Sequence, residues 1–205
     1  GWGIMNSTAI KEAVAVGYPR EKIFGVWWSG AEPDVRPAEG GAKGYQAAML
    51  QHGAGQFGVH AALKKYLYDK GKGVAKWEET DEVLYNRGLV NAMLGVESIR
   101  TAMKKYGNKP MTGEQVRWGI EHLDLSAARL KELGFEGMLQ PLKVTCADHE
   151  GTRAGRIQQW DGKKWVVVSD WYQSDDKVIK PMVDAAAKKY AAEKKLPVRD
   201  CSKES

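Results

Sequence analysis

Residues 1–30, GWGIMNSTAIKEAVAVGYPREKIFGVWWSG, contain the pattern on which the fold prediction depends. Trp2 to Met5 has the composition of the last residues of a β-strand. Asn6-Ser7-Thr8 then supplies cap residues for a helix of about ten residues, which Gly17 stops. Lys22 to Trp28 predicts a second strand. The order of a strand end, a helix and a strand is typical of an α/β layer with parallel pairing.

The next segment extends this layer. Ala42 to Leu50 predicts another strand, and the Pro- and Gly-rich loop Ser29 to Gly41 separates it from the previous one. Residues 1–50 therefore form the first predicted segment, and its fold class is α/β.

The pattern becomes helical after Phe57. Three helices are predicted, at Gly58 to Lys70, Asp81 to Tyr106 and Thr112 to Leu133, followed by an extended piece, Met138 to Thr145. Residues 51–145 are therefore a mainly helical segment. The middle helix carries small residues that predict a closely packed face, and these include Gly88, Asn91, Gly95, Ser98 and Ala102.

Residues 146–205 form the third predicted segment. Arg153 to Trp160 and Trp165 to Ser169 predict a hairpin across Asp161-Gly162-Lys163-Lys164, because Asp-Gly is a common hairpin turn. A basic amphipathic helix, Asp176 to Lys195, and a polar tail complete the chain.

Composition argues against several classes of protein. The net charge of +5 comes from Lys and Arg residues that are interleaved with acids, which is typical of a solvated surface and not of a nucleic-acid-binding patch. No apolar run is long enough to span a bilayer. The four histidines lack metal spacing, and no G-x-S-x-G, H-E-x-x-H or Walker A motif occurs. We therefore expect that the chain binds no metal and no cofactor and that it is not an enzyme.

One glycine motif suggests an alternative function, a nucleotide-dependent enzyme. Residues Gly53 to Gly58, GAGQFG, match the G-x-G-x-x-G fingerprint of dinucleotide-binding enzymes. That fingerprint works only when its helix leads to a second strand with an acid at its end, about 20 residues on. Glu78 and Glu79 have the distance, but a helix follows them. A nucleotide-dependent enzyme is the alternative, and a connection between two lobes is favoured.

Two neighbouring sites are candidates for ligand recognition. The first is the predicted strand end and helix start, Trp2 to Thr8, where free backbone N–H groups favour an anion. The second is the end of the next strand, Trp27 to Glu32. Both would lie on the carboxyl edge of the sheet and face one crevice. Strand alternation predicts that at most one of Trp27 and Trp28 stands over it.

An aromatic platform beside an anion-binding helix start suits a small carboxylate, whereas Glu32 suits an ammonium group. The opposing interpretation is that the tryptophans are core and rim and that Asn6 is only a cap. The candidate ligand-binding residues are Trp2, Met5, Asn6, Ser7, Trp28, Ser29 and Glu32.

The two cysteines, Cys146 and Cys201, fit no zinc or redox spacing. A link between them would close a loop of 55 residues, which is worth about 4 kcal/mol in chain entropy. From spacing alone, a disulfide and two free buried thiols are equally compatible with the sequence.

Several short motifs, taken in order, resemble the type I periplasmic binding proteins of the leucine/isoleucine/valine-binding family, especially the branch that binds amides or aromatic acids. The resemblance covers essentially all 205 residues and depends on the order of the motifs. They are Trp2 to Ser7, Gly25 to Asp34, Ala42 to Tyr45, Tyr85 to Gly88, Cys146 to Gly151, Gln159 to Trp165 and Arg199 to Ser202.

This resemblance implies two α/β lobes joined by three crossing strands, with a small organic solute held between them. The solute would be a branched-chain amino acid, an amide or an aromatic carboxylate, presented in the periplasm to an ABC permease in the membrane. A ligand-sensing receptor module of the same fold is the alternative. The family's C-lobe contacts fall at Met5 and Asn6 and near Trp28 to Glu32, and a disulfide between the two cysteines is plausible in the family.

The resemblance also implies that this chain matches the C-terminal half, so that the first half, with any signal peptide, would lie elsewhere. The helices after Phe57 would then lack most of the sheet that they normally cover. We expect either self-association of the chain or a non-native packing of this lobe.

Overall fold

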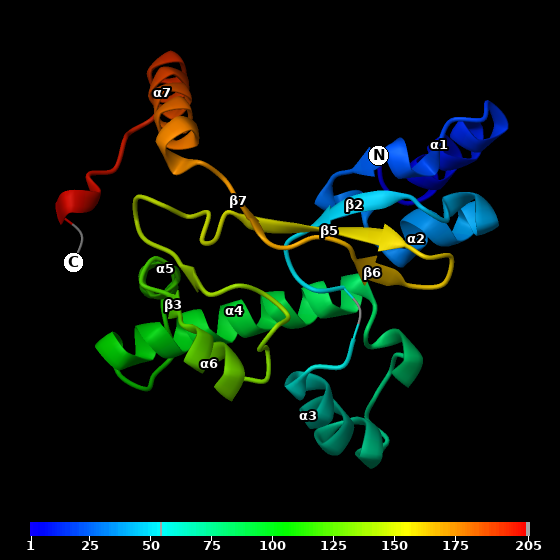
Figure 1. Ribbon diagram of the computed structural model, residues 1–205. Helices are drawn as coiled ribbons and strands as arrows, with labels where there is room; N and C mark the ends of the chain where they lie inside the picture. Colours follow the sequence, from blue (N-terminus) through cyan, green and yellow to red (C-terminus); the bar gives the residue numbers. More distant parts are fainter. Residues whose placement is uncertain (54, 204–205) are drawn as a thin grey trace.

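The computed structural model describes residues 1–53 and 55–203, which form a mixed α/β structure (Figure 1). The main sheet has the strand order β1-β2-β5-β6, and β7 pairs with β5. Its strands are β1 (Phe24–Gly25), β2 (Gln46–Met49), β5 (Ala154–Trp160), β6 (Trp165–Val167) and β7 (Tyr172–Gln173). A second, two-stranded sheet consists of β3 (Asp124–Leu125) and β4 (Leu142–Lys143).

The helices surround this sheet and continue away from it. They are α1 (Ile4–Ala15), α2 (Glu32–Val35), α3 (Gly58–Tyr66), α4 (Val83–Tyr106), α5 (Gly113–Ile120), α6 (Ala127–Glu132) and α7 (Asp176–Lys194). In Figure 1, α1 and α2 lie near β2, whereas α4 runs along the other side of the molecule and α7 stands apart.

The sheet confirms the predicted pairing. β1 and β2 are parallel, and β2, β5 and β6 are successively antiparallel. The hairpin between β5 and β6 is closed by Asp161, whose carboxylate accepts the backbone N–H groups of Lys163 and Lys164. Gly162 has φ 106°, a value that glycine adopts without strain. The Asp-Gly turn therefore forms where the sequence predicts it.

The first residues differ from the prediction. Trp2 to Met5 is not a strand end, because α1 begins at Ile4 and includes Asn6-Ser7-Thr8 within its first turns. A strand needs a hydrogen-bonded neighbour, and the N–H of Gly3 is bound instead by the carboxylate of Asp34. The predicted strand Lys22 to Trp28 is also shorter, since only Phe24–Gly25 pairs with β2.

The first hydrophobic core lies between α1, α2 and the main sheet. Ile10 from α1 packs in this core with Val35 from α2 and Tyr45, which precedes β2. Trp160 and Trp165 close it from the hairpin, with ring centroids 5.5 Å apart. Val83, the first residue of α4, belongs to the same core. The helical part is therefore joined to the sheet through the start of α4.

The second core lies among α4, α6 and the segment that follows α6. It contains Val90 and Met93 of α4, together with Leu130, Phe135 and Met138. The helices thus cover one another's apolar faces. The predicted helix Thr112 to Leu133 is two helices, α5 and α6, because β3 interrupts it and pairs with β4.

The contact between α4 and α5 explains part of the predicted small-residue face. A Cβ on Gly119 of α5 would lie 2.1 Å from the carbonyl oxygen of Ser98 and 3.0 Å from the Cβ of Ala102. Ser98 and Ala102 are therefore packed closely, as the sequence indicates. Gly88 and Gly95 of α4 face open space instead. The close packing covers only the C-terminal part of that face.

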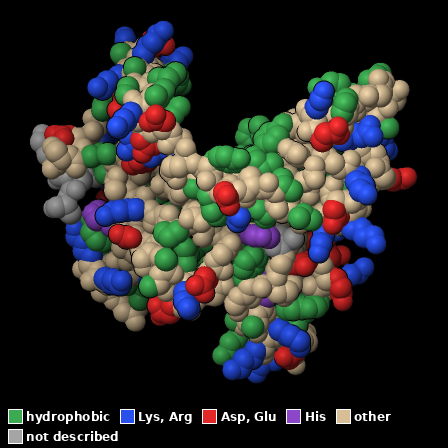
Figure 2. Space-filling view, in the orientation of Figure 1, with side chains coloured by type: hydrophobic (Ala, Val, Ile, Leu, Met, Phe, Trp, Pro, Cys, Tyr) green, Lys and Arg blue, Asp and Glu red, His purple; other side chains and the backbone are tan. Residues whose placement is uncertain are grey.

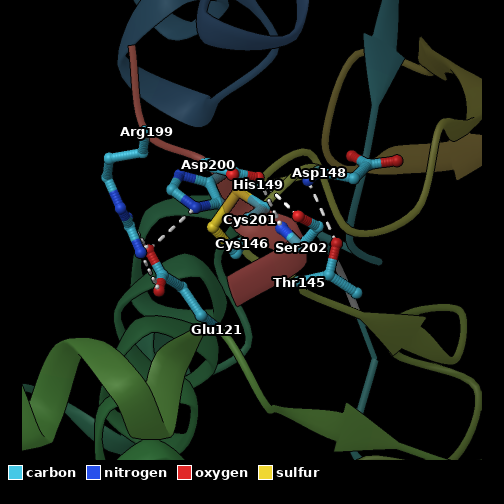
Figure 3. The surroundings of a disulfide bond; sticks show 9 residues. All are labelled: Glu121, Thr145, Cys146, Asp148, His149, Arg199, Asp200, Cys201 and Ser202. Atoms are coloured by element: carbon cyan, nitrogen blue, oxygen red, sulfur yellow. Dashed lines mark hydrogen bonds and ion pairs between the residues drawn. A yellow bond between two sulfur atoms is a disulfide. The ribbon is translucent and has the colours of Figure 1, made fainter. Parts of the chain in front are cut away.

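The C-terminal segment is attached by a disulfide between Cys146 and Cys201, whose Cα atoms are 5.6 Å apart. Next to it, both guanidinium Nη atoms of Arg199 donate to the buried carboxylate of Glu121, at 2.6 and 2.9 Å. His149 also contacts Glu121, at 3.2 Å, and Figure 3 shows both side chains directed at it. The sequence alone left the state of the cysteines open, and the structure pairs them.

Helix α7 confirms the predicted amphipathic helix but has no buried residue along its length. Its exposed apolar residues include Val178, Ile179, Met182 and Val183. Figure 2 shows apolar and basic side chains side by side over α7. An apolar stripe on this helix is therefore uncovered in the structure.

Candidate functional site

A hollow of about 370 Å³ opens directly after β1. We call it the tryptophan hollow, because three indole rings line it. Charged side chains reach it from α2 and from α4. Its lining residues are Trp2, Gly3, Trp27, Trp28, Ala31, Pro33, Asp34, Leu84 and Arg87. Its volume lies at the lower end of the range for small-molecule sites, about 300–1,000 Å³.

The indoles come from two segments of the chain. The Trp2 and Trp28 rings meet edge to face, with centroids 6.4 Å apart, and Trp28 lies 6.0 Å from Trp27. Their exposed fractions are 61% for Trp2, 36% for Trp27 and 46% for Trp28. Such exposure of large aromatic rings is unusual unless they meet another molecule.

The prediction that at most one of Trp27 and Trp28 stands over the crevice is wrong. That prediction assumed a strand, in which neighbouring side chains point to opposite faces. Residues Trp27–Ser29 form a 3-10 turn instead. In a 3-10 turn successive side chains are separated by about 120° and not by 180°, so both indoles reach the hollow.

Asp34 holds the two segments together. One carboxylate oxygen accepts the N–H of Gly3, and the other accepts the N–H of Ala31 at 2.9 Å. Asp34 is buried, and its backbone carbonyl accepts a hydrogen bond from the Asn6 side chain at 3.2 Å. This carboxylate therefore fixes the position of the chain next to Trp2 against α2.

Three predicted site residues lie outside the lining of the hollow. The Tyr45 hydroxyl lies within hydrogen-bond distance of the Asn6 side-chain oxygen, at 3.3 Å, and of the Ser29 hydroxyl, at 3.2 Å. Ser7 is buried and donates to the carbonyl of Ile4 within α1. Met5 is exposed and does not line the hollow. The structure thus brings Trp2 and Trp28 together, whereas Asn6 and Ser29 contact Tyr45 and Ser7 bonds within α1.

Glu32 lies in a different place from the tryptophans. It lines a second hollow, of about 510 Å³, with Arg36, His52 and Lys163 among its neighbours. Its carboxylate accepts the N–H of Val83, at 3.1 Å, at the start of α4. Burial raises the pKa of Glu32 to about 7, although this hydrogen bond opposes the shift. The structure therefore does not place Glu32 in the tryptophan hollow.

Arg87 reaches the tryptophan hollow from α4, and sequence reasoning missed it. Its guanidinium carbon lies 4.3 Å from the centroid of the Trp27 ring, and one Nη donates to the Trp27 carbonyl at 3.2 Å. Its Nε is buried and has no acceptor among the described residues. Burial lowers the pKa of Arg87, and nearby Asp34 opposes this. Arg87 lies in the motif Tyr85 to Gly88, but 60 residues separate it from Trp27, so no local pattern assigns it to this site.

The dinucleotide interpretation of Gly53 to Gly58 is wrong. Within this motif, Ala54 lies outside the described residues. The helix that follows the motif is α3, and it leads through 3-10 turns to α4. Between β2 and β3 the described part of the chain contains no strand, so the crossover that a dinucleotide site needs is missing. The motif instead connects the sheet to the helical part.

The side chains near Cys146 also lack the geometry of an active site. Asp148 is bound by Arg153 at 2.6 Å, whereas His149 is paired with Glu121. These contacts direct the two groups to different partners. Among the described residues, no three His, Cys, Asp or Glu side chains cluster as metal ligands would. Nor is any described helix both long enough and apolar enough to cross a membrane.

Comparison with known families gives one match. A family model described as "Periplasmic binding protein" matches residues 1–164, which is most of the chain. A search among curated proteins returns no match.

Three solved structures are similar to this chain. A crystal structure described as an ABC transporter permease from the Pseudomonas fluorescens group is 43% identical, with a TM-score of 0.91. A branched-chain amino acid ABC transporter from Thermus thermophilus with bound valine is 22% identical, with a TM-score of 0.64. A solute-binding protein of an ABC transporter from R. palustris, in complex with benzoate, is 13% identical, with a TM-score of 0.54.

The two more distant structures show similarity of fold. The alignments cover 98%, 88% and 85% of this chain, in the same order, but only 48%, 47% and 43% of those chains. This chain therefore spans about half the length of the solved structures that it matches.

Proposed function

This chain belongs to the periplasmic binding protein family, and we propose from this that it is part of the extracytoplasmic solute-binding component of an ABC uptake transporter. Its solute would be a small organic molecule. The tryptophan hollow would be this half's contribution to the binding site, and a membrane permease would receive the solute. Nothing in the described residues requires a catalytic role, and we infer that the chain is not an enzyme.

The observation that carries this proposal is the exposure of three neighbouring indoles around a hollow with an arginine at its wall. Burying one indole in contact with a ligand removes about 150–250 Å² from water, which is worth roughly 4–6 kcal/mol before entropic costs. Trp2 and Trp28 were both predicted as ligand contacts, and their shared hollow supports that prediction. Asn6 would act indirectly, through its hydrogen bond to the Asp34 carbonyl.

The ligands bound in two of the similar solved structures support our proposal that the solute is small. One distant relative has valine bound and another has benzoate bound, and both ligands are small organic acids. We infer that the solute of this chain is of similar size. The division of the chain into residues 1–50, 51–145 and 146–205 as successive lobe segments belongs to the same proposal.

The proposal is tested by thermal unfolding with candidate solutes. We expect at least one branched-chain amino acid, short amide or aromatic carboxylate to stabilise the chain, by about 2.7 kcal/mol at a hundredfold excess over Kd. Trp28→Ala should remove this effect. Tyr66→Ala is the matched control, because Tyr66 is also an exposed aromatic residue and lies on α3. If no compound in the three classes shifts the unfolding temperature, the proposal fails.

A further inference from the structure

We propose that Arg87 is the specificity-determining residue of the tryptophan hollow, and that it selects a monocarboxylate with an apolar or aromatic body and no ammonium group. This inference rests on the proposed function and narrows it to one class of solute. Three features of the described residues support it: an incompletely used guanidinium, a carboxylate that is already occupied, and an aromatic wall.

The guanidinium of Arg87 has N–H donors that no described residue accepts. Arg87 is the one Lys or Arg among the described residues that line the hollow. A guanidinium carries five N–H donors, and among the described residues the one hydrogen bond of Arg87 is to the Trp27 carbonyl. Its Nε is buried and has no acceptor among the described residues, so the Nη donors are the ones that could meet a solute. A carboxylate supplies two acceptor oxygens in the geometry that a guanidinium fits best.

The position of Arg87 favours this role. The contact with the Trp27 ring, at 4.3 Å, and the hydrogen bond to the Trp27 carbonyl hold the guanidinium at the wall of the hollow. A fixed guanidinium loses little conformational entropy when a carboxylate binds. Partial burial lowers the pKa of Arg87, and nearby Asp34 opposes this shift. An incoming anion would oppose it in the same way.

The acids near the hollow exclude an ammonium group. Asp34 is the carboxylate that lines it, and both of its oxygens already accept backbone N–H groups, from Gly3 and Ala31. Glu32 lines the other hollow and binds the start of α4. An amino acid would therefore bury its ammonium group without a counterion, which is unfavourable. The same solute without the ammonium group avoids this cost.

The aromatic wall sets the body of the solute. Trp2, Trp27 and Trp28 line the hollow with rings inclined to one another by 86° and 52°, and we infer that they contact a flat or compact apolar group. Leu84 and Pro33 complete this wall. A benzoate-sized molecule fits a hollow of about 370 Å³ and would reach Arg87 with its carboxylate. A longer aliphatic acid is compatible with the same chemistry.

Arg87 could alternatively serve only to hold Trp27 in place. The two roles differ in their dependence on the charge of the solute. If Arg87 only supports Trp27, its removal weakens every ligand by a similar factor. If Arg87 binds the carboxylate, its removal weakens acids and leaves neutral analogues of the same shape nearly unchanged. Benzoate and benzamide form such a pair, and phenylpyruvate and L-phenylalanine test the ammonium group.

The experiment titrates the four compounds into the chain labelled with ¹⁵N at its indoles and follows the tryptophan N–H signals. We expect Trp2, Trp27 and Trp28 to respond, while Trp160 in the core serves as the internal control. Benzoate should bind at least about tenfold more tightly than benzamide, the factor expected for one charge-assisted hydrogen bond. Phenylpyruvate should likewise bind more tightly than L-phenylalanine.

Arg87→Met should weaken benzoate at least about tenfold and change benzamide by less than about threefold, since the lost interaction is specific to the charge. Arg87→Lys keeps the charge without the planar fork and should recover part of the preference. Unchanged Trp160 and Trp165 signals would show that both variants fold. Arg36→Met, in the other hollow, is the matched control and should bind as the unaltered chain does.

Each result has one meaning. Equal affinities for benzoate and benzamide, equal affinities for L-phenylalanine and phenylpyruvate, or equal loss of both acid and amide in Arg87→Met would each overturn the inference. In these cases a solute still binds, so the proposed function stands. If neither these four compounds nor valine and leucine bind, the proposed function itself fails, and the inference falls with it.

Discussion

At the scale of single residues, Trp28 and Glu32, which the sequence predicts to share one binding site, have different surroundings in the structure. Trp28 and Glu32 are four residues apart, yet they line different hollows. Trp28 stays exposed, whereas Glu32 is only 5% exposed and binds the first residue of α4. Glu32 therefore connects the sheet and the helical part, and its protonation should affect the stability of this connection.

Glu32→Gln tests this connection. Burial raises the pKa of Glu32 from 4.5 to about 7, with a further rise from Glu82, so the folded protein binds a proton more tightly than the unfolded chain does. The unaltered protein should therefore lose stability as the pH rises from about 4.5 to 7. The variant has no charge to bury at this position, so its stability should not fall over this pH range. Above pH 7 we expect it to be the more stable by up to about 3 kcal/mol, at 1.36 kcal/mol per pKa unit.

Urea unfolding at pH 4 and pH 8 measures the effect. At pH 4 the two proteins should be nearly equal, because Glu32 is protonated in both the folded and the unfolded state. Glu12→Gln, an exposed position on α1, is the control and should show no such difference. A variant that is less stable at pH 8 would mean that the hydrogen bond to Val83 outweighs the cost of burying the charge.

At the scale of elements, the α4–α5 contact depends on the absence of one side chain. Gly119 of α5 approaches the α4 backbone so closely that a Cβ would lie 2.1 Å from the Ser98 carbonyl. Backbone atoms cannot move aside as a side chain can. We expect Gly119→Ala to destabilise the chain by about 1–3 kcal/mol, the usual cost of overpacking. Chemical denaturation would measure this.

Gly95→Ala provides the matched comparison on α4. Gly95 faces open space, so an alanine there adds helix propensity without a clash, and we expect a gain of up to about 1 kcal/mol. A lower free energy of unfolding for Gly119→Ala together with a higher one for Gly95→Ala would support the observed packing of α4 on α5. Destabilisation of similar size at both positions would contradict it.

At the scale of the whole molecule, the C-terminal segment is attached by the Cys146–Cys201 disulfide and the Arg199–Glu121 ion pair. Arg199 lowers the pKa of Glu121, so this carboxylate stays charged well below neutral pH. Between these contacts and the sheet, α7 buries no residue. Without the disulfide, the attachment of residues 196–203 would depend more heavily on the Arg199–Glu121 ion pair.

We therefore expect Cys146→Ser/Cys201→Ser to lower the free energy of unfolding by up to about 4 kcal/mol, the chain-entropy value for a loop of 55 residues. Trypsin should also cleave at Lys194 and Lys195 faster in the variant. Denaturation and timed proteolysis, each compared with the unaltered chain under non-reducing conditions, measure these effects. Unchanged stability and cleavage would mean that the ion pair is sufficient.

The uncovered apolar stripe of α7 belongs to the same scale. The sequence predicted self-association because the helices would lack their sheet. Part of that premise is now corrected, since α4 and α6 share a core of their own. Met182 and its neighbours remain exposed on α7. Self-association therefore stays a prediction, and α7 is the surface on which it would depend.

The sequence by itself determined the features that are local in the chain. The Asp161-Gly162 turn and the helix at Asp176–Lys194 follow from residues within one turn or one apolar period of each other. The ordered motifs indicated the family as well. Trp2 and Trp28 were found because they are large aromatic residues near the expected edge of a sheet.

Only the tertiary structure decided which distant groups meet. Arg87 joins the tryptophans across 60 residues, and Asp34 binds Gly3 across 31. Glu32 does not line the tryptophan hollow, because its carboxylate accepts the N–H of Val83, 51 residues away at the start of α4. Such contacts arise from the competition among all buried donors and acceptors for partners, which no local pattern records. The site is therefore a property of the folded chain.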